Sequence, residues 1–302
     1  TPKPPLVRLR VCTAHAPVLA HRALRTLNHA KPQHMRFCWG RCAASGCNIP
    51  SGMFHKNIHT VIFDGRPDRK GQSAMQYSNM IPGRFVSRPN RFLAQVETAD
   101  GVQTCHVKNT GRCAELLLPG APVWLQRFGA DAKRKTKFDL IAVQKGALLL
   151  NIDSQAPNAA AREFLASGGL GWIPSVLRPE YTWGDSRFDF YLEHGGRRCL
   201  AEVKGVTLEE DGTALFPDAP TLRGIKHLEG LSRAAAQGFA CCVLFVVQFS
   251  PAAAFAPNRR THPAFADALR AARDAGVCVL AYDCAVTPES MVLRAPVPVT
   301  GL

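Results

Sequence analysis

Hydrophobic and polar residues alternate along the chain from about residue 88 to residue 151, a period typical of half-buried β-strands. Two of the alternating segments flank Asp100-Gly101, a dipeptide that favours a tight hairpin turn. The predicted strands are residues 92–97, 102–107, 121–128, 138–143 and 147–152. About five short strands without a long helix predict a closed barrel of the oligonucleotide-binding (OB) type over residues 81–152, with a plain β-meander as the alternative.

After residue 152 the pattern changes to helices alternating with strands. The predicted helices are residues 158–166, 221–237 and 263–275, and the predicted strands are residues 186–193, 199–208, 239–249 and 277–282. Residues 239–249 are apolar almost throughout, which is typical of a strand buried on both faces. A hairpin followed by strand–helix–strand predicts an α/β domain of αβββαβ order with a mixed sheet over residues 153–302. The whole chain is therefore an α+β/α/β two-domain protein.

The first 74 residues differ from the rest in composition. They hold twelve Lys and Arg against two Asp and no Glu, a net charge of +10 out of +14 for the chain. No helical or alternating pattern persists in them. We interpret residues 1–80 as a disordered extension, or as sequence upstream of a natural start at Met75 or Met80. The remainder is only mildly basic, so charge alone is a weak indication of nucleic-acid binding.

Cysteine usage and hydropathy indicate the compartment. Eleven cysteines are an odd number at uneven spacings, which favours reduced thiols over a disulfide framework. The longest apolar run, residues 239–247, is too short to cross a bilayer. We therefore expect a cytoplasmic protein with no membrane partner.

Two acids and a lysine form the most informative pattern: Asp189, then twelve residues, then Glu202-Val-Lys204. On a strand, Glu202 and Lys204 project from the same face, and a hairpin brings Asp189 beside Glu202. Phe188 and Phe190 are expected on the opposite face. Two carboxylates so placed bind a hard divalent ion, Mg²⁺ in the first instance and Mn²⁺ as an alternative, and Lys204 can orient a water or stabilise a phosphate. An exposed hairpin face with a surface salt bridge is the alternative interpretation.

Further candidates surround this pattern. Glu180 precedes the first predicted strand and could supply a third metal-binding carboxylate, or be an ordinary surface acid. Arg223 and His227 lie one turn apart on the predicted helix, where they could contact the phosphate of bound DNA. His227 could also relay protons, or pack at the boundary between helix and sheet. Asp218 or Thr221 is expected to cap that helix.

The predicted barrel carries basic and polar residues suited to DNA. The cluster at residues 133–137 falls in a loop between strands, where such barrels track a nucleic-acid strand; a solvated loop is the alternative. Arg88 and Arg91 stand beside Phe85 and Phe92, so charge and stacking surface come together, although one of the two phenylalanines must be core. The predicted DNA-binding residues of the barrel are Arg88, Arg91, His106, Asn109, Lys133, Arg134 and Lys135.

Several longer motifs follow one another in order. They are Arg91-Phe-Leu-Ala, His106-Val-Lys-Asn109-Thr-Gly111, Lys133-Arg-Lys135, Ser186-Arg-Phe-Asp189-Phe, Glu202-Val-Lys204-Gly-Val-Thr207-Leu, Phe216-Pro-Asp218-Ala and Thr221-Leu-Arg223-Gly-Ile-Lys-His227-Leu. Together they resemble the sugar fermentation stimulation protein family, from about Ile81 to the end of the chain. The loop around Cys113 and the proline at position 220 depart from the family pattern.

The resemblance implies an OB-type barrel followed by a domain of the PD-(D/E)xK nuclease type. It also implies metal-ligand roles for Asp189 and Glu202 and the catalytic position for Lys204. Proteins of this family are described as DNA-binding, with a regulatory link to sugar (maltose) metabolism.

Two functions remain open at this point. We expect a protein that binds DNA nonspecifically and has a Mg²⁺-dependent phosphodiesterase (nuclease) site. The alternative is a non-catalytic DNA-binding regulator of sugar (maltose) metabolism genes. The intact Asp, Glu and Lys set favours the enzyme, whereas the family description favours binding alone. A sugar sensor is not indicated, since no clear array of aromatic and amide residues is visible.

Overall fold

The computed structural model describes residues 75–109, 111–129 and 133–302, all of which fall within one compact unit. The extension predicted for residues 1–74 lies outside these residues. Residues 75–80, however, belong to the folded part. Tyr77 is buried, its backbone N–H donates to the carbonyl of Glu289 at 2.7 Å, and Met80 begins the first strand. The predicted extension was therefore wrong at its C-terminal end.

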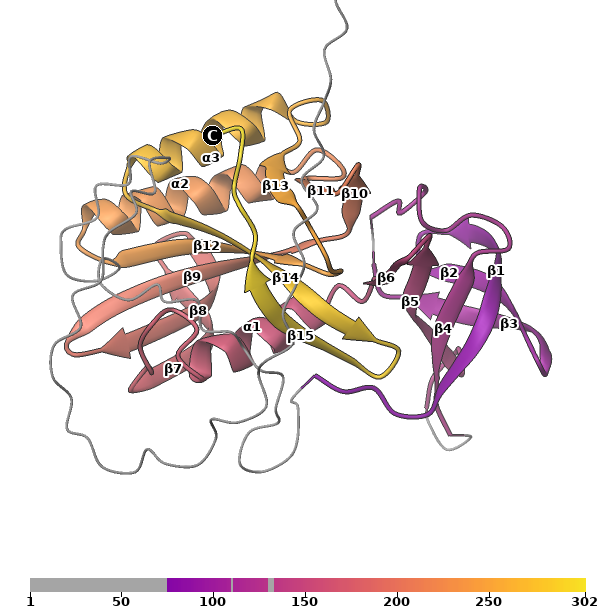
Figure 1. The fold of residues 1–302 in the computed structure, drawn as a ribbon. Coiled ribbons are helices and arrows are strands. Elements are labelled where there is room, and N and C mark those ends of the chain that lie inside the picture. Colours follow the sequence, from indigo (N-terminus) through magenta and orange to yellow (C-terminus); the bar gives the residue numbers. More distant parts are fainter. Residues whose placement is uncertain (1–74, 110, 130–132) are drawn as a thin grey trace, which may run out of the picture. The chain divides into compact units, whose positions relative to one another are not determined.

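A closed five-stranded barrel occupies the first part of the fold (Figure 1). Its strands are β1 (Met80–Asn90), β2 (Leu93–Thr98), β3 (Gly101–Val107), β4 (Pro122–Arg127) and β5 (Phe138–Lys145), followed by β6 (Leu148–Asn151). The hydrogen-bonded order is β3-β2-β1-β4-β5-β6, and an additional parallel pairing of β3 with β5 closes the ring. The closure confirms the predicted barrel and excludes the plain meander.

Strand β1 was missed from the sequence because it does not alternate. It contains Pro82 and Pro89, and Phe85 is its one fully buried side chain. Gly83 shows why pattern alone fails here: a Cβ at that position would lie 2.6 Å from Cγ1 of Val96. The strand is therefore specified by close backbone approach, which leaves no hydrophobic signal.

A six-stranded mixed sheet forms the centre of the second domain, in the order β15-β14-β12-β9-β8-β7. The elements are α1 (Ala156–Ala166), β7 (Val176–Trp183), β8 (Ser186–His194), β9 (Arg197–Val206), α2 (Leu222–Ala236), β12 (Ala240–Val247), α3 (Pro263–Asp274), β14 (Cys278–Thr287) and β15 (Ser290–Pro296). Strands β9, β12 and β14 are parallel, and the outer pairings are antiparallel. A small sheet of β10 (Leu208–Glu210), β11 (Thr213–Phe216) and β13 (Ala254–Pro257) stands beside it.

Strands β7 and β15 were not predicted, and both are edge strands. Most of β7 is exposed or half-buried, and it includes Pro179, so it carries neither alternation nor a long apolar run. The three predicted helices and the four predicted strands are present, so the sequence identified the interior of the large sheet and missed its edges and the small sheet of β10, β11 and β13.

Helices cover both faces of the large sheet (Figure 1). Helix α1 packs through Phe164 into one apolar cluster, which includes Leu244 of β12. Helices α2 and α3 pack through Leu231 and Leu269 into another, which includes Phe245 of β12. Successive residues of β12 thus enter opposite clusters, as predicted for a strand buried on both faces. None of these helices, in the part of the chain that the structure describes, is long and apolar enough to span a membrane.

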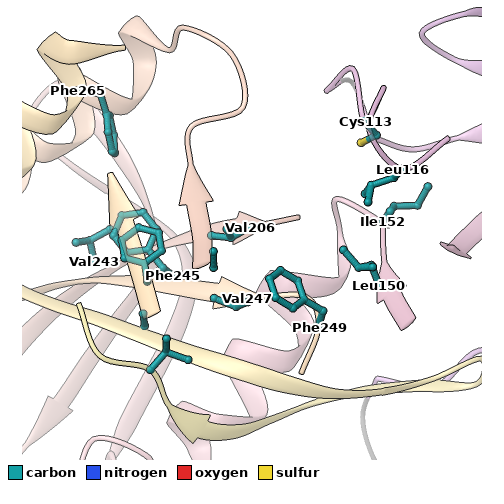
Figure 2. Packing of buried hydrophobic residues seen from close by; sticks show 14 of the residues in the cluster. Cys113, Leu116, Leu150, Ile152, Val206, Val243, Phe245, Val247, Phe249 and Phe265 are labelled. Carbon is teal, nitrogen blue, oxygen red and sulfur yellow. The ribbon is translucent and has the colours of Figure 1, made fainter. Parts of the chain in front are cut away.

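Strand β6, which follows the barrel strands, is hydrogen-bonded to the residue after β12. The backbone N–H of Asn151 donates to the carbonyl of Gln248 at 3.0 Å, and the Gln248 side-chain amide donates to the carbonyl of Asn151 at 2.9 Å. The apolar cluster continues across this junction, from Leu150 and Ile152 to Phe249 (Figure 2). The barrel and the α/β domain therefore share one hydrophobic core.

We expect Phe249→Ala to lower the free energy of unfolding by about 3–5 kcal/mol, because it empties a fully buried site in this shared core. Urea unfolding of the whole chain measures the change. Phe92→Ala removes the same side chain from a position that is 45% exposed and should change stability by less than about 0.5 kcal/mol. Equal effects of the two substitutions would contradict the shared core.

Candidate metal and phosphate site

The ladder between β8 and β9 stops where the candidate site begins. Regular pairing runs from His194 opposite Arg197 to Phe190 opposite Ala201. Beyond it, Oδ2 of Asp189 accepts a hydrogen bond from the backbone N–H of Val203 at 2.7 Å. The Asp189 carboxylate thus takes the place of the next backbone acceptor in the ladder. This contact brings Asp189 beside Glu202, the residue before Val203. The predicted approach of Asp189 to Glu202 is confirmed.

The predicted side-chain alternation around Asp189 was wrong. Phe188 packs on the α2 face of the sheet, edge-on to His227, whereas Phe190 joins the cluster on the α1 face. Regular pairing of β8 with β9 ends at Phe190. On the other side of β8, the residue of β7 opposite Asp189 is Glu180, and its backbone has a φ of +55°. Since β8 loses its regular pairing with β9 here and β7 is irregular opposite Asp189, strict alternation along β8 breaks down.

Glu202 is the most deeply buried acid of the site, with 2% of its surface exposed. Its Oε1 accepts hydrogen bonds from Nζ of Lys204 at 2.5 Å and from Nδ1 of His227. On the far side of the ring, Nε of Arg223 donates to Nε2 of His227 at 3.4 Å, an arrangement in which Nδ1 is the donor toward Glu202. The three predicted residues Lys204, Arg223 and His227 are thereby joined to Glu202 in one chain of contacts.

The two acids have opposite pKa shifts. Burial, together with the negative charge of Glu202, raises the pKa of the Asp189 carboxyl. Burial also raises the pKa of Glu202, but the hydrogen bonds from His227 and Lys204 and the Lys204 charge outweigh it, and the net shift lowers the pKa. Glu202 is therefore held ionised, whereas the pKa of Asp189 stays raised although Val203, Asn158 and Lys204 act to lower it.

A divalent cation fits this set of residues. Oε2 of Glu202 is buried and has no hydrogen-bond partner among the described residues. A buried carboxylate oxygen without a partner costs free energy, and a cation would remove that cost and offset the Asp189 charge as well. Two carboxylates with retained waters are a usual set for Mg²⁺. Asp189 and Glu202 are the residues that would hold it.

Glu180 does not join this set. It lies on β7, a strand that the sequence did not predict, and its Oε2 is paired with Nε of Arg187 at 2.9 Å. Its side chain is 54% exposed. Among the residues that the structure describes, no three His, Cys, Asp or Glu side chains are grouped to hold a metal. A third metal-binding carboxylate at Glu180 is not supported, and Glu180 is the surface acid of the alternative interpretation.

Asn158 of α1 was not identified from the sequence, although its side-chain amide donates to Oδ1 of Asp189 at 2.8 Å. It lies at the start of a predicted helix, and no motif marks it. The cap of α2 could be predicted more closely: Oγ1 of Thr221 accepts from the backbone N–H of Gly224 at 3.0 Å. Of the two proposed caps, Thr221 fills that position, and Asp218 remains exposed.

Arg88 holds a loop of the barrel. Its guanidinium donates to the backbone carbonyls of Asn109 at 2.7 Å and Gly111 at 2.9 Å, and also to those of Arg91 and Arg112. Oδ1 of Asn109 accepts from the backbone N–H of Gly111 at 2.8 Å. Arg88 and Asn109, both predicted to bind DNA, therefore have a structural role in fixing the loop.

The predicted basic cluster of the barrel is exposed. Lys133 and Lys135 lie on the surface, whereas Arg134 pairs with Asp139 and lies over the Phe128 ring at 3.9 Å. Two lysines and a stacked arginine are therefore available to a phosphate backbone.

The other barrel candidates are also at the surface. Arg91 lies over the Phe92 ring at 4.7 Å, and Phe92 is 45% exposed, while Phe85 is the core phenylalanine of the pair. His106 is half-buried, with Nδ1 3.5 Å from the buried Asp139. The Arg91 and Phe92 pair supplies charge and a ring face together.

Fold and site define a class: a two-domain protein in which an OB-type barrel precedes a mixed α/β domain with a paired-carboxylate site. Residues 86–152 match the domain family described as "SfsA N-terminal OB domain", and residues 155–290 match "Sugar fermentation stimulation protein RE domain". The chain belongs to the sugar fermentation stimulation protein family.

Individual relatives agree with this assignment. A sugar fermentation stimulation protein homolog of Desulfitobacterium hafniense is 53% identical over 218 residues, which cover 72% of this chain and 94% of the relative. Another, from Clostridium beijerinckii, is 46% identical over 220 residues, covering 73% and 97%. The solved structure titled "The structure of Pyrococcus Furiosus SfsA in complex with Ca2+" is similar with a TM-score of 0.68 at 25% identity, covering 76% of this chain and 100% of that one.

We expect Asp189→Asn, in the metal-free protein, to gain stability relative to wild type as the pH rises from acid to neutral. Because the folded-state pKa of Asp189 is raised, its ionised form opposes folding above that pKa, and the opposition disappears as the pH falls through it. An amide cannot accept from both the Val203 N–H and the Asn158 amide, so the change of the difference with pH, and not its sign, is diagnostic. Urea unfolding in EDTA at a series of pH values measures it.

Asp185→Asn is the control for this series. Asp185 is exposed, and although desolvation opposes the shift, Lys226 and Arg233 lower the pKa of its carboxyl. This variant should not gain stability relative to wild type as the pH rises. If the difference between Asp189→Asn and wild type in EDTA does not change with pH, the charge effect inferred at Asp189 is wrong.

Proposed function

We propose that this protein binds DNA and hydrolyses its phosphodiester bonds in a Mg²⁺- or Mn²⁺-dependent reaction at Asp189, Glu202 and Lys204. The observation that carries the proposal is the buried Glu202 carboxylate, with one oxygen bound by Lys204 and His227 and the other without a partner. The mixed sheet flanked by helices, with Asp189 and Glu202-Val-Lys204 on adjacent strands, supports a domain of the PD-(D/E)xK nuclease type.

A related solved structure supports a divalent cation in this protein. The solved protein of Pyrococcus furiosus is titled as a complex with Ca²⁺. Ca²⁺ and Mg²⁺ are both hard cations that bind carboxylate oxygens, so a family site for one is compatible with the other. When bound at Asp189 and Glu202, such a cation would neutralise phosphate charge and acidify a water.

The side chains of this protein supply the remaining chemistry. The Lys204 side chain is 16% exposed, so its ammonium group can contact Glu202 on one side and a phosphate oxygen or water on the other. Arg223 is exposed at the start of α2 and adds positive charge on the same face as His227. His227, bonded on both ring nitrogens, positions Glu202 and is not free to accept a proton from water.

The barrel is suited to hold the strand. It presents the exposed lysines Lys133 and Lys135 and the exposed Phe92 ring with Arg91 above it. Charge contacts to phosphate and ring contacts to bases are the two components of binding that does not depend on sequence. The matching family is described as an OB domain, a fold that commonly binds oligonucleotides.

A second candidate is a DNA-binding regulator of sugar (maltose) metabolism genes that does not cut DNA. The contact between Lys204 and Glu202 favours it, because a lysine that neutralises a buried acid can be purely structural. The relatives are named sugar fermentation stimulation protein homologs, which is compatible with such a role.

We expect the full chain to cut labelled single- or double-stranded DNA in Mg²⁺ or Mn²⁺ and not in EDTA. Lys204→Ala should lower the rate at least about 100-fold while DNA binding is retained. Lys204→Arg keeps a positive charge beside Glu202 and should also be slow, since a guanidinium does not replace a compact ammonium. Lys145→Ala removes a lysine from a comparable pair with Glu209 outside the site and should cut normally.

The outcomes separate the two candidates. Salt-sensitive binding without cutting in any metal would reject the nuclease and favour the regulator. Failure of the wild-type chain to bind either form of DNA would reject both.

Metal binding can be tested apart from catalysis. Mg²⁺, Mn²⁺ or Ca²⁺ should stabilise the wild-type chain against urea, by about 2.7 kcal/mol at a concentration 100 times the Kd. Asp189→Asn should abolish this gain, whereas Asp267→Asn, which alters an exposed acid of α3, should leave it unchanged. An equal gain in all three proteins would place the cation elsewhere.

A further inference from the structure

A cavity of about 120 Å³ lies next to the candidate site. Gly205, Val206 and Thr207 line one side of it, and they follow Lys204 directly along the chain. Its other walls include Asn109 from the barrel and Phe216 from β11. A strand of nucleic acid with a phosphate at Lys204 would therefore have its neighbouring nucleotide at the mouth of this cavity.

The wall chemistry excludes phosphate as the occupant. Among the described residues that line the cavity, none is Lys or Arg. Their polar side chains are the Asp218 carboxylate, the amides of Asn109 and Gln248, and the hydroxyls of Ser154 and Thr207, next to the apolar surface of Phe216. Asp218 is exposed and makes no ion pair with any residue that the structure describes. A neutral polar ring with a hydrogen-bond donor for Asp218 matches these walls; an anion does not.

The polar walls are held in place before any ligand arrives. A Cβ on Gly111 would lie 2.4 Å from Oδ2 of Asp218, so the absence of a side chain there lets the barrel loop touch the carboxylate. Arg88 fixes that loop through the carbonyls of Asn109 and Gly111. On the opposite wall, the Gln248 amide is bound to the carbonyl of Asn151. A preformed polar site loses little free energy to ordering when a ligand binds.

We propose that this cavity receives one unstacked nucleobase that carries an exocyclic amino group, and that Asp218 accepts a hydrogen bond from that group. The proposal rests on the proposed function, since it names a base contact beside the phosphate site. The volume equals that of about four waters, at roughly 30 Å³ each in the liquid, which suits a single ring. Cytosine combines one ring with an amino group that acids can recognise, whereas thymine lacks the amino group.

The test compares fluorescently labelled dC12 and dT12 in binding to the full chain, by anisotropy in Ca²⁺. The basic residues 1–74 add sequence-independent affinity, so the ratio of the two dissociation constants is the quantity of interest. We expect dC12 to bind roughly tenfold more tightly than dT12. In Asp218→Ala the ratio should fall to about one, because the variant has no side-chain acceptor for the amino group.

Asp267→Ala is the matched control and should keep the wild-type ratio, since it removes an equal charge from the exposed surface of α3. Removal of any acid can raise the affinity for both oligonucleotides, and the ratio is insensitive to that change. A wild-type ratio near one, with both oligonucleotides bound, overturns the cavity proposal and leaves the proposed function standing. An unchanged ratio in Asp218→Ala overturns it equally, and absence of binding to either oligonucleotide overturns the proposed function itself.

Discussion

The buried charge of Glu202 is the constraint on which the arrangement of the second domain depends. An ionised carboxylate removed from water costs several kcal/mol unless its oxygens are bound. Lys204 on the same strand and His227 on α2 bind one oxygen, so the position of α2 over the sheet is coupled to that of β9. Arg223, one turn before His227, fixes the ring from its other side. Because Oε2 has no partner among the described residues, the charge is only half satisfied.

The direction of the strands explains why the site and the cavity are neighbours. Strands β9 and β12 are parallel, and β9 ends at Val206 opposite Val247 of β12. Ligand sites in sheets of this kind lie outside the carboxyl ends of parallel strands, where the backbone leaves the ladder. Thr207 and Gln248 are the first residues beyond the two ends, and both line the cavity. The junction with the barrel forms at this same edge, so Asn109 can supply the facing wall.

Prediction from the sequence succeeded where apolar burial specifies an element and failed where backbone geometry does. The apolar run of β12 and the helices α2 and α3 left clear patterns, and the Glu202-Val-Lys204 spacing placed two side chains on one face correctly. Strand β1 left none, because glycine at position 83 permits a close approach that has no hydrophobic signature. Glu180 was predicted as a site residue from its position in the sequence. In the structure its carboxylate pairs with Arg187 at the surface instead. Such pairings depend on three-dimensional position and cannot be derived from spacing alone.

The two acids of the site distinguish a ligand site from a structural ion pair. In a purely structural pair, the carboxylate and its cation would satisfy each other, and no second acid would be needed. Here Asp189 brings another negative charge beside Glu202, and its pKa is raised by burial and by that neighbour. The protein tolerates this repulsion although Lys204 is already engaged with Glu202. A purely structural role gives no reason to retain an acid whose charge opposes folding, whereas a site for a divalent cation requires that charge. The pKa of Asp189, which stays raised although Val203 and Asn158 donate to its two oxygens, therefore supports the proposed metal site over a purely structural ion pair.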